Sequence, residues 1–374
     1  MKIVVGFARA KILIRGGSFD VYICRMQKVV LVAVLDWGLG HASRIVPVIE
    51  GLLAQNVRVI LAGSGASLTY LQKRYPQMES RKMPSEEMRY GKSGAGLALL
   101  KRALHQPGIN KIEQAWTGEI VGKEKINGII SDNLYGVYHH EIPSVIVTHQ
   151  VGLLVPGFKK TFDRKLARWL GHFTEVWVPD LPGAASLSGK MTENAFLRIP
   201  KIFVGNLSRL QSVASAKKDI ALTALISGPE PQRSLFEKEV LKLMKKTPGR
   251  KVLIRGILGG STEKIAYATD MEVYDFLDDT ALSEMISWSE WVVCRSGYST
   301  LCDLRVLGAK AVVVPTPQQP EQLYLARRGS EKGWFQSTEQ QLISKAILED
   351  RQKFIPVEEG DLLTPVLKGF LGKL

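Results

Sequence analysis

Residues 28–63, KVVLVAVLDWGLGHASRIVPVIEGLLAQNVRVILAG, indicate how the first part of the chain folds. Residues 28–35 form a continuous apolar run rich in valine, which is typical of a strand buried on both faces of a parallel sheet. After a glycine turn, apolar residues between 45 and 53 recur at helical spacing, and a second strand is predicted at 56–63. This is one βαβ unit, for which a right-handed crossover is expected.

Similar apolar runs continue along the chain and predict two successive arrays of alternating strands and helices. Strands are predicted at 126–131, 143–149, 175–179 and 201–205, and then at 221–227, 251–257, 271–277, 291–296 and 311–315. Helical patterns separate most of the later strands, at 234–246, 281–289, 299–307 and 339–350. We therefore predict an α/β protein with two doubly wound, Rossmann-like domains that face each other across a cleft.

The predicted domains are residues 26–206 and 207–355, because the segment between 205 and 215 loses all periodicity. The last helix, within 356–374, is too short to form a domain and is expected to pack back onto one of them. Residues 1–25 are basic and partly apolar, and Lys or Arg interrupts every candidate signal core. They are interpreted as an upstream extension, with an extra strand as the alternative.

The composition excludes several classes of protein. With 45% hydrophobic and 23% charged residues, the chain is expected to be globular rather than disordered. The net charge of +14 indicates an anionic partner, which could be a nucleic acid, an acidic membrane surface or a phosphorylated substrate. Three cysteines make no disulfide framework, so a reducing cytosol is expected. We predict no membrane-spanning segment and no bound metal, since neither a long apolar run nor a metal-binding motif occurs.

The turn DWGLGH holds the first candidate site residues. Gly38 and Gly40 lie between a predicted strand and a predicted helix, where backbone N–H groups can face a phosphate or a sugar. The turn is weak evidence for a dinucleotide site, because Ser43 replaces the third glycine and no acidic residue ends the second strand. His41 starts the helix and is either a general base or a capping and packing residue.

Polar residues end two further strands of the first array. Asp132 and Asn133 follow one strand, and His149 and Gln150 follow another. Ligands bind at this edge of open α/β sheets, although Asp-Asn is also ordinary turn chemistry.

Residues 294–322, CRSGYSTLCDLRVLGAKAVVVPTPQQPEQ, hold the densest group of candidate binding residues. A buried strand leads through a glycine turn into a helix, whose N-terminal N–H groups are a suitable seat for a diphosphate. Ser299 or Thr300 is expected to cap this helix, and Asp303 either completes a capping box with Thr300 or binds a ribose. The following loop offers polar side chains to a sugar ring, namely Gln318, Glu321 and Gln322.

The segment 158–173 predicts an amphipathic helix that could lie on a membrane. Phe158, Phe162 and Trp169 share one face, and basic residues crowd the remainder. A helix that covers the core and exposes a basic face is the alternative.

The residues quoted above carry a resemblance to the family 28 glycosyltransferases, a family that includes the N-acetylglucosaminyltransferases that form lipid II of peptidoglycan. Residues 292–326 resemble the C-terminal signature of the family, and VYDFLDD resembles the segment that meets the edge of uracil. VGNLSR resembles the motif at the junction of the two domains, and LDWGLGH resembles the N-terminal glycine-rich loop that ends in histidine. These motifs stand in the family's order and span most of residues 26–325.

The resemblance implies a GT-B fold, an N-terminal acceptor-side domain and a C-terminal domain that binds the nucleotide sugar. Carried over by position, it implies that Gly38, Gly40 and His41 line the acceptor and phosphate side, where the two glycines contact the donor nucleotide and His41 is a candidate base. It also implies contacts to the donor, which would be Arg209 to the diphosphate, Phe276 and Leu277 to the nucleobase, Ser299 and Thr300 to the phosphates beside the Ser296-Gly297 turn, Asp303 to the ribose, and Gln322 to the sugar.

Three departures from the family pattern bear on the donor. Asp303 replaces a glutamate, Leu323 replaces a second glutamine, and residues 226–233 replace a glycine-rich loop. These departures leave the donor sugar open. The segments DWGLGHASR and SDNLYG also differ from the lipid II-forming enzymes, which indicates a sister group with another acceptor.

The predicted function is transfer of a hexosyl group, with N-acetylglucosamine as a candidate, from a UDP-sugar to a lipid-linked or cell-envelope acceptor. A metal-independent inverting mechanism without a cofactor is implied. The protein is expected in the cytoplasm, with peripheral binding to the inner face of an anionic membrane. One alternative is a UDP-sugar 2-epimerase, for which Glu230 and Glu321 are the candidate carboxylates. The other is a non-catalytic nucleotide-binding protein; no nucleic-acid partner is expected, because no RNA-binding motif occurs.

Overall fold

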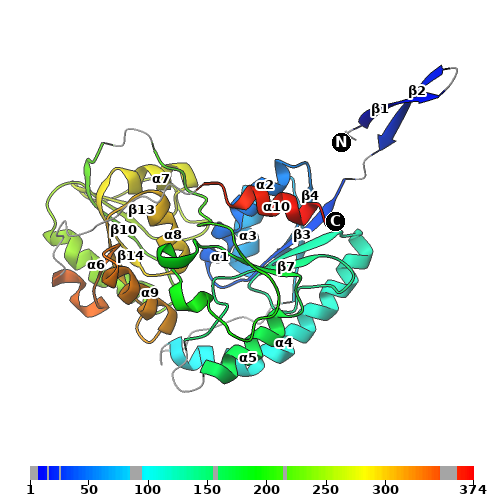
Figure 1. Ribbon diagram of the computed structural model, residues 1–374. Coiled ribbons are helices and arrows are strands. Elements are labelled where there is room, and N and C mark those ends of the chain that lie inside the picture. The colour runs from blue at the N-terminus through cyan, green and yellow to red at the C-terminus, as the bar shows by residue number, and fades with distance from the viewer. Residues whose placement is uncertain are drawn as a thin grey trace.

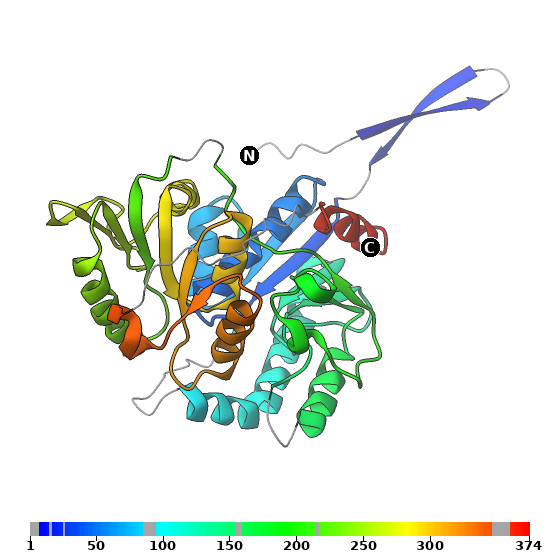
Figure 2. The same ribbon diagram turned by 60° about the vertical axis from the view of Figure 1, so that its left-hand side comes forward.

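The computed structural model divides the chain into two α/β halves (Figures 1 and 2). It describes residues 7–14, 17–24, 27–84, 95–154, 159–213, 217–345 and 360–374. We call the described residues between 27 and 213, together with 360–374, the N-terminal half, and residues 217–345 the C-terminal half. Each half is built on one seven-stranded sheet.

The sheet of the N-terminal half is entirely parallel and has the strand order β5-β4-β3-β6-β7-β8-β9. Its central strands are buried on both faces, as valine-rich and isoleucine-rich runs require in a parallel sheet. Its strands are β3 (Val29–Val34), β4 (Arg58–Gly63), β5 (Glu79–Lys82), β6 (Gly128–Asp132), β7 (Ser144–Val147), β8 (Glu175–Val178) and β9 (Lys201–Phe203).

The sheet of the C-terminal half has the order β12-β13-β11-β10-β14-β15-β16. All its pairs are parallel except β12 with β13, which are antiparallel. Its strands are β10 (Ile220–Leu225), β11 (Lys251–Ile254), β12 (Ile265–Ala268), β13 (Met271–Tyr274), β14 (Ser289–Arg295), β15 (Ala311–Val314) and β16 (Gln336–Ser337).

Helices connect the strands in both halves (Figure 1). Those of the N-terminal half are α1 (Leu39–Arg44), α2 (Val46–Leu53), α3 (Gly65–Arg74), α4 (Ala95–Glu124), α5 (Lys159–Leu170) and α10 (Leu363–Leu371), with the 3-10 turns η1 (Gly183–Ala185) and η2 (Gly189–Thr192). Those of the C-terminal half are α6 (Gln232–Lys246), α7 (Asp279–Ser287), α8 (Tyr298–Val306) and α9 (Pro320–Glu331), with the 3-10 turn η3 (Gln340–Lys345).

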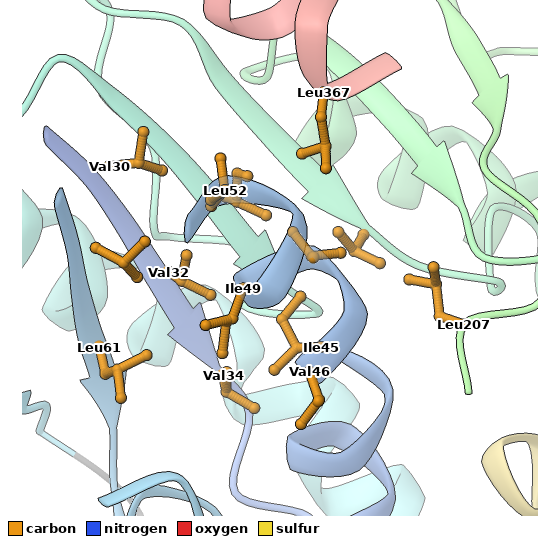
Figure 3. Packing of buried hydrophobic residues seen from close by; sticks show 14 of the residues in the cluster. Val30, Val32, Val34, Ile45, Val46, Ile49, Leu52, Leu61, Leu207 and Leu367 are labelled. Carbon is orange, nitrogen blue, oxygen red and sulfur yellow. The ribbon is translucent and has the colours of Figure 1, made fainter. Parts of the chain in front are cut away.

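Strand β3 shows how the core of the N-terminal half is divided between the two faces of its sheet. Val30 and Val32 point to the face that α2 covers, where Leu52 and Leu367 also pack (Figure 3). Leu31 points to the opposite face and packs in the cluster that includes residues of α4. Both faces are therefore covered, as in a doubly wound fold.

Helix α10 belongs to the N-terminal half although it lies at the far end of the sequence. Figure 1 shows it beside α2, and Leu367 and Phe370 are buried in the same core cluster as β3. Gly51 of α2 permits this contact, because a Cβ atom there would lie 2.4 Å from Leu367 Cδ1. The polypeptide thus passes from the N-terminal half to the C-terminal half and returns.

Every strand predicted from the sequence is present, and the prediction of alternating strands and helices in two arrays is confirmed. The helix expected after the first strand is instead two short helices, α1 and α2, with Pro47 in the first turn of the second. Strands β5, β12 and β16 were not predicted, and neither were helices α3, α4 and α9. The helix predicted at 339–350 is the 3-10 turn η3 in its first part, and residues 346–350 lie outside the described residues.

The beginning of the chain forms a separate hairpin. Strands β1 (Phe7–Ile14) and β2 (Gly17–Cys24) pair with each other and with neither sheet. Figure 1 shows this hairpin extending away from both halves. Whether residues 1–25 have a role of their own stays a prediction, as do the domain limits.

No helix in the described part of the chain is both long enough and apolar enough to cross a membrane.

Candidate functional site

The predicted glycine turn and the predicted diphosphate seat touch each other across the two halves. Ser299 Oγ donates a hydrogen bond of 2.8 Å to the carbonyl oxygen of Gly40. A Cβ atom on Gly40 would lie 3.2 Å from the same hydroxyl, so a side chain there would require Ser299 to shift by a few tenths of an ångström. Gly38, at φ 76°, adopts a conformation that favours glycine and gives the turn its direction. The N-terminal turns of α1 and α8 therefore face each other.

Within this turn, His41 is held by a carboxylate at the end of a neighbouring strand. Its Nδ1 lies 2.6 Å from Oδ1 of Asp132, the last residue of β6. Arg44 Nη2 also lies 3.0 Å from this nitrogen, but it donates to Asp132 Oδ1 over the shorter distance of 2.6 Å. Because an ionised carboxylate can only accept, the 2.6 Å contact with Asp132 places the proton on Nδ1, and Nε2 presents its lone pair. Among the residues that the structure describes, none bonds to His41 Nε2. This is the arrangement of a histidine base with an orienting acid.

Arg44 completes the surroundings of this pair. Its side chain is 2% exposed, and its Nε and Nη2 donate to the two oxygens of Asp132 at 2.7 and 2.6 Å. Its Nη1 lies 3.0 Å from Nδ1 of His149, which follows strand β7. A bidentate pair of this kind fixes the carboxylate in one orientation.

The charges of this group keep the histidine neutral. Burial lowers the pKa of His41, and the nearby guanidinium of Arg44 lowers it further, against the opposing effect of Asp132. Burial alone would raise the pKa of Asp132, but Arg44 and then His41 outweigh it and hold that pKa at about 2. At neutral pH the site therefore contains an ionised acid and a neutral imidazole, as a general base requires.

His149 joins this group to the C-terminal half. Its Nε2 lies 3.0 Å from Oε1 of Glu321 in the first turn of α9, and Gln150 donates to the other oxygen of that carboxylate. Its ring stacks on Tyr298 of α8, with the centroids 4.0 Å apart and an angle of 6° between the planes. Tyr298 also donates its hydroxyl to the carbonyl of Pro179. These contacts hold the two halves together beside the base.

The prediction that Ser299 or Thr300 caps helix α8 is wrong. The N-cap residue is Gly297, and no described side chain bonds to the free N–H groups of the first turn. Asp303 accepts a 2.6 Å hydrogen bond from Ser208 Oγ rather than closing a capping box with Thr300. The first turn, which contains Ser299 and Thr300, thus keeps N–H donors and a positive dipole end facing the N-terminal half.

Asp303 lies in a group of charges between the two halves. Arg209 Nη1 is 3.9 Å from Asp303 Oδ2, and the Nε of the same arginine pairs with Asp279. Arg74 of α3 in the N-terminal half pairs with Asp279 as well. Burial raises the pKa of Asp303, while Arg209 and Ser208 oppose this change. The structure brings together Arg209 and Asp303, the residues predicted for the diphosphate and the ribose.

The two residues predicted for the nucleobase differ in their surroundings. Leu277 is 7% exposed and packs with Ile254 in the core of the C-terminal half. Phe276 is partly buried and packs against the core cluster of the N-terminal half, which Leu39 also borders. Phe276 is therefore the more accessible of the two to a ligand between the halves.

The predicted sugar-binding loop is ordered by its own glutamines. Gln318 has a positive φ of 62°, which is uncommon for a residue with a side chain and is often found at functional sites. Gln319 caps helix α9, and Oε1 of Gln322 accepts a 2.8 Å bond from the backbone N–H of Thr316. Ser296 Oγ donates to the carbonyl of Gln322. These bonds fix the start of α9 beside that of α8.

The predicted membrane-contact residues lie on α5 or just before it. Phe158 lies outside the described residues, and Phe162 is half-buried. Trp169 packs against Tyr135, with ring centroids 5.6 Å apart, and Lys165 lies 5.1 Å from its ring centre. Part of the aromatic face of this helix therefore covers the core.

Two side chains that shape the site were not predicted. Arg44 follows His41 by one helical turn, which was the only available signal, because its partner Asp132 lies 88 residues away. Tyr298 directly precedes the helix predicted at 299–307 and was not singled out, although it is buried and stacks on His149. Among the described residues, no three His, Cys, Asp or Glu side chains are grouped to hold a metal.

Comparison with known families supports the resemblance in the C-terminal half. The family model of the glycosyltransferase family 28 C-terminal domain matches residues 214–354. The predicted resemblance to family 28 is thus confirmed there.

Two curated relatives carry the name UDP-N-acetylglucosamine–N-acetylmuramyl-(pentapeptide) pyrophosphoryl-undecaprenol N-acetylglucosamine transferase. The protein from Actinobacillus pleuropneumoniae is 27% identical over 170 residues, which cover 43% of this chain and 44% of that protein. The protein from Haemophilus influenzae is 32% identical over 115 residues, which cover 29% of this chain and 32% of that protein. The chain therefore spans less than half the length of these curated relatives.

Solved structures extend the similarity of fold to nearly the whole chain. The calicheamicin glycosyltransferase CalG4 gives a TM-score of 0.59 at 14% identity and covers 93% of this chain and 99% of its own. UGT89C1 of Arabidopsis thaliana complexed with UDP-L-rhamnose gives 0.61 at 12% identity and covers 92% of this chain and 98% of its own. The predicted fold class, two doubly wound domains of the GT-B type, is confirmed.

Proposed function

We propose that the protein is a glycosyltransferase that moves a hexosyl group from a UDP-sugar to an acceptor hydroxyl with inversion at the anomeric carbon. The observation that carries this proposal is the His41–Asp132 pair at 2.6 Å, opposite the uncapped first turn of α8 in the matched family domain. The pair supplies a base on one side of the interface, and α8 supplies a seat for a diphosphate on the other.

The reaction follows from these positions. His41 Nε2 takes the proton of the acceptor hydroxyl as the oxygen attacks the anomeric carbon. The bond to the diphosphate breaks, and the departing negative charge is stabilised by the N-terminal N–H groups of α8 and by the guanidinium of Arg209. Asp132, fixed by Arg44, keeps the proton of His41 on Nδ1 and stabilises the imidazolium that forms.

The donor is proposed to bind mainly to the predicted C-terminal domain, residues 207–355. Asp303 would bind the ribose, Ser299 and Thr300 the phosphates, and Glu321 with Gln322 the hexose. The curated relatives are named for UDP-N-acetylglucosamine, which makes this the first donor to test. Because Ser299 bonds directly to Gly40, the two halves must part locally to admit the diphosphate.

The acceptor is proposed to be lipid-linked or part of the cell envelope, and to reach His41 from the N-terminal half. The names of the curated relatives, which specify a pyrophosphoryl-undecaprenol acceptor, support this class. The basic side chains of α5 and the net charge of +14 support peripheral binding to the inner face of an anionic membrane from the cytoplasm.

The carboxylates expected of an epimerase are placed less favourably for that reaction. Glu230 is 56% exposed and bonds to Arg233 and Ser234 at the start of α6. Glu321 accepts hydrogen bonds from His149 and Gln150, which make it a weaker base for abstracting a proton from carbon, although its remaining lone pairs can still accept from sugar hydroxyls. The transferase is therefore the function that the geometry favours.

Release of UDP from UDP-N-acetylglucosamine, UDP-glucose and UDP-galactose, with and without a bacterial lipid extract, tests the proposal. We expect lipid-dependent UDP release by the wild-type protein and its loss in His41→Gln. His172→Gln, which changes a histidine that stacks on Tyr138 away from the interface, is the matched control and should keep full activity. If UDP does not raise the melting temperature and no UDP-sugar is consumed, the proposal is wrong. UDP-sugar epimerisation without an acceptor would favour the alternative enzyme.

A further inference from the structure

His149 has an unusual set of contacts for a residue of the N-terminal half. It is 5% exposed, and it bonds to Arg44 in its own half. In the C-terminal half, its Nε2 lies 3.0 Å from the carboxylate of Glu321, and its ring stacks on the parallel ring of Tyr298. The ring is thus fixed in its plane by two hydrogen bonds and across its face by a stack.

The donors and acceptors around the ring permit one tautomer. Arg44 can only donate, so Nδ1 of His149 must accept. The proton then lies on Nε2, from which it is donated to Glu321. A protonated ring, or the opposite tautomer, would set an N–H of the imidazole against an N–H of Arg44. The contacts therefore select the tautomer that carries its proton on Nε2.

His149 consequently links the two carboxylates of the site. On one side, Arg44 bonds both His149 and Asp132, the partner of the base. On the other side, His149 bonds Glu321, which lies one residue before Gln322 in the first turn of α9. We call Asp132, Arg44, His149 and Glu321 the cross-domain chain.

The cross-domain chain also balances charge. It holds two carboxylates and one guanidinium, so it carries one excess negative charge while His41 is neutral. When His41 takes a proton, the imidazolium stands beside Arg44, and Asp132 can balance only one of the two cations. The second carboxylate comes from the C-terminal half and is held in place by His149. Low exposure makes such charges interact more strongly than they would in water.

We propose that His149 is a positioning residue that couples the hexose subsite at Glu321 to the base His41. A hexose whose hydroxyls donate to Glu321 fixes that carboxylate, and His149 and Arg44 pass its position to Asp132. UDP alone has no hexose and cannot act on Glu321 in this way. This inference rests on the proposed function and deepens it, because it identifies how the donor half controls the acid–base group of the other half.

A first experiment measures binding and turnover with UDP and UDP-N-acetylglucosamine as probes. His149→Phe keeps a ring to stack on Tyr298 but removes both hydrogen bonds, whereas His149→Gln retains one donor and one acceptor. We expect His149→Phe to lower kcat by about 10- to 100-fold, the loss seen when a side chain that orients a metal-ligating histidine is removed. Its affinity for UDP should stay as in the wild type, and the added affinity that the hexose gives should fall. His149→Gln should recover most of the wild-type kcat and most of the affinity that the hexose adds.

The control is His172→Phe, which also replaces a stacked histidine by phenylalanine in the N-terminal half. It should leave kcat and both affinities unchanged. If His149→Phe weakens UDP and UDP-N-acetylglucosamine equally, or leaves kcat unchanged, His149 does not couple the two sites and the inference is overturned.

A second experiment needs no ligand and separates this inference from the proposed function. The ring signals of His41 are assigned with His41→Gln and followed by nuclear magnetic resonance as Glu321 is changed to Gln. We expect Glu321→Gln to shift the His41 signals when His149 is present, and to shift them much less when His149→Phe is also present. Equal shifts in both backgrounds, or none in the wild type, would overturn the coupling. If the wild-type protein binds neither UDP probe, the proposed function fails while this measurement still decides the role of His149.

Discussion

The substitution Asp132→Asn tests the pair on which the proposed chemistry rests. It keeps the size of the side chain but removes the charge that Arg44 and His41 share. Asp132 is fully buried, and its pKa lies near 2 instead of the usual 3.8. A difference of that size corresponds to about 2 kcal/mol of stabilisation of the charged form.

The loss of stability should exceed that figure. Arg44 is 2% exposed, so the substitution leaves a buried guanidinium without its carboxylate. Breaking a buried pair in this way costs about 3–5 kcal/mol. We expect the free energy of unfolding, measured with urea, to fall by this amount at pH 7. Because the folded pKa of Asp132 is depressed, its contribution is present above pH 3.8 and is lost as the pH falls toward 2.

The same substitution should reduce turnover much more than it reduces stability. The amide of Asn can donate to His41 Nδ1 and so favour the wrong tautomer, and the imidazolium loses its counter-charge. In hydrolases with a comparable acid, the same change costs about 10⁴-fold in kcat. UDP release at a temperature where the variant is folded is the assay.

Glu175→Gln is the matched control for Asp132→Asn. Glu175 is also buried and charged, but it lies at the start of β8 and pairs with Trp177 and Lys373. The Glu175→Gln variant should be less stable than the wild type and should keep the wild-type kcat. If Asp132→Asn keeps more than about a tenth of the wild-type kcat, Asp132 does not orient the base as proposed.

Three further predictions follow from other parts of the site. Asp303→Ala should lower the affinity for UDP by about 10- to 100-fold, as expected when hydrogen bonds to a charged group are lost. The control Asp278→Ala removes the N-cap of α7 and should lower only the stability of the protein, so equal UDP affinity in the two variants would refute the ribose role of Asp303. Burial and Arg44 lower the pKa of His41, so kcat/KM should stay constant as the pH falls through 6.5 and should decline only below the lowered pKa. A decline of kcat/KM centred above pH 6.5 would contradict the assignment of His41 as a neutral base. Lys160→Glu on α5 should weaken binding to anionic vesicles by about fivefold or more with no change in melting temperature, and unchanged binding would show that α5 only covers the core.

The fold could be predicted from the sequence because burial on both faces leaves a strong pattern. The valine-rich run of β3 and the isoleucines of β6 can be read directly as strands of a parallel sheet. Strand β5, with the sequence ESRK, carries no such pattern because it is an edge strand and is partly exposed. Strand β16 has only two residues, which are too few to form such an apolar pattern.

The site could be predicted only where local sequence determines the chemistry. His41 and the glycines before it follow from the turn between β3 and α1, and Ser299 follows from the start of α8. The partners of these residues are distant in sequence, so spacing could not reveal them. A capping box was one of the two roles predicted for Asp303, because Thr300 is three positions before it, yet its partner Ser208 is 95 residues away.

Helix α10 has a consequence for the order in which the protein can fold during synthesis. Lys28 bonds to the carbonyl of Leu371, 343 residues further along the chain, and Leu367 and Phe370 fill the core against which β3 and α2 pack. While the ribosome is still making the C-terminal half, the N-terminal half has already emerged with that apolar surface uncovered. The first half translated is therefore the last to be completed, and a chaperone that binds exposed apolar segments would find its target there.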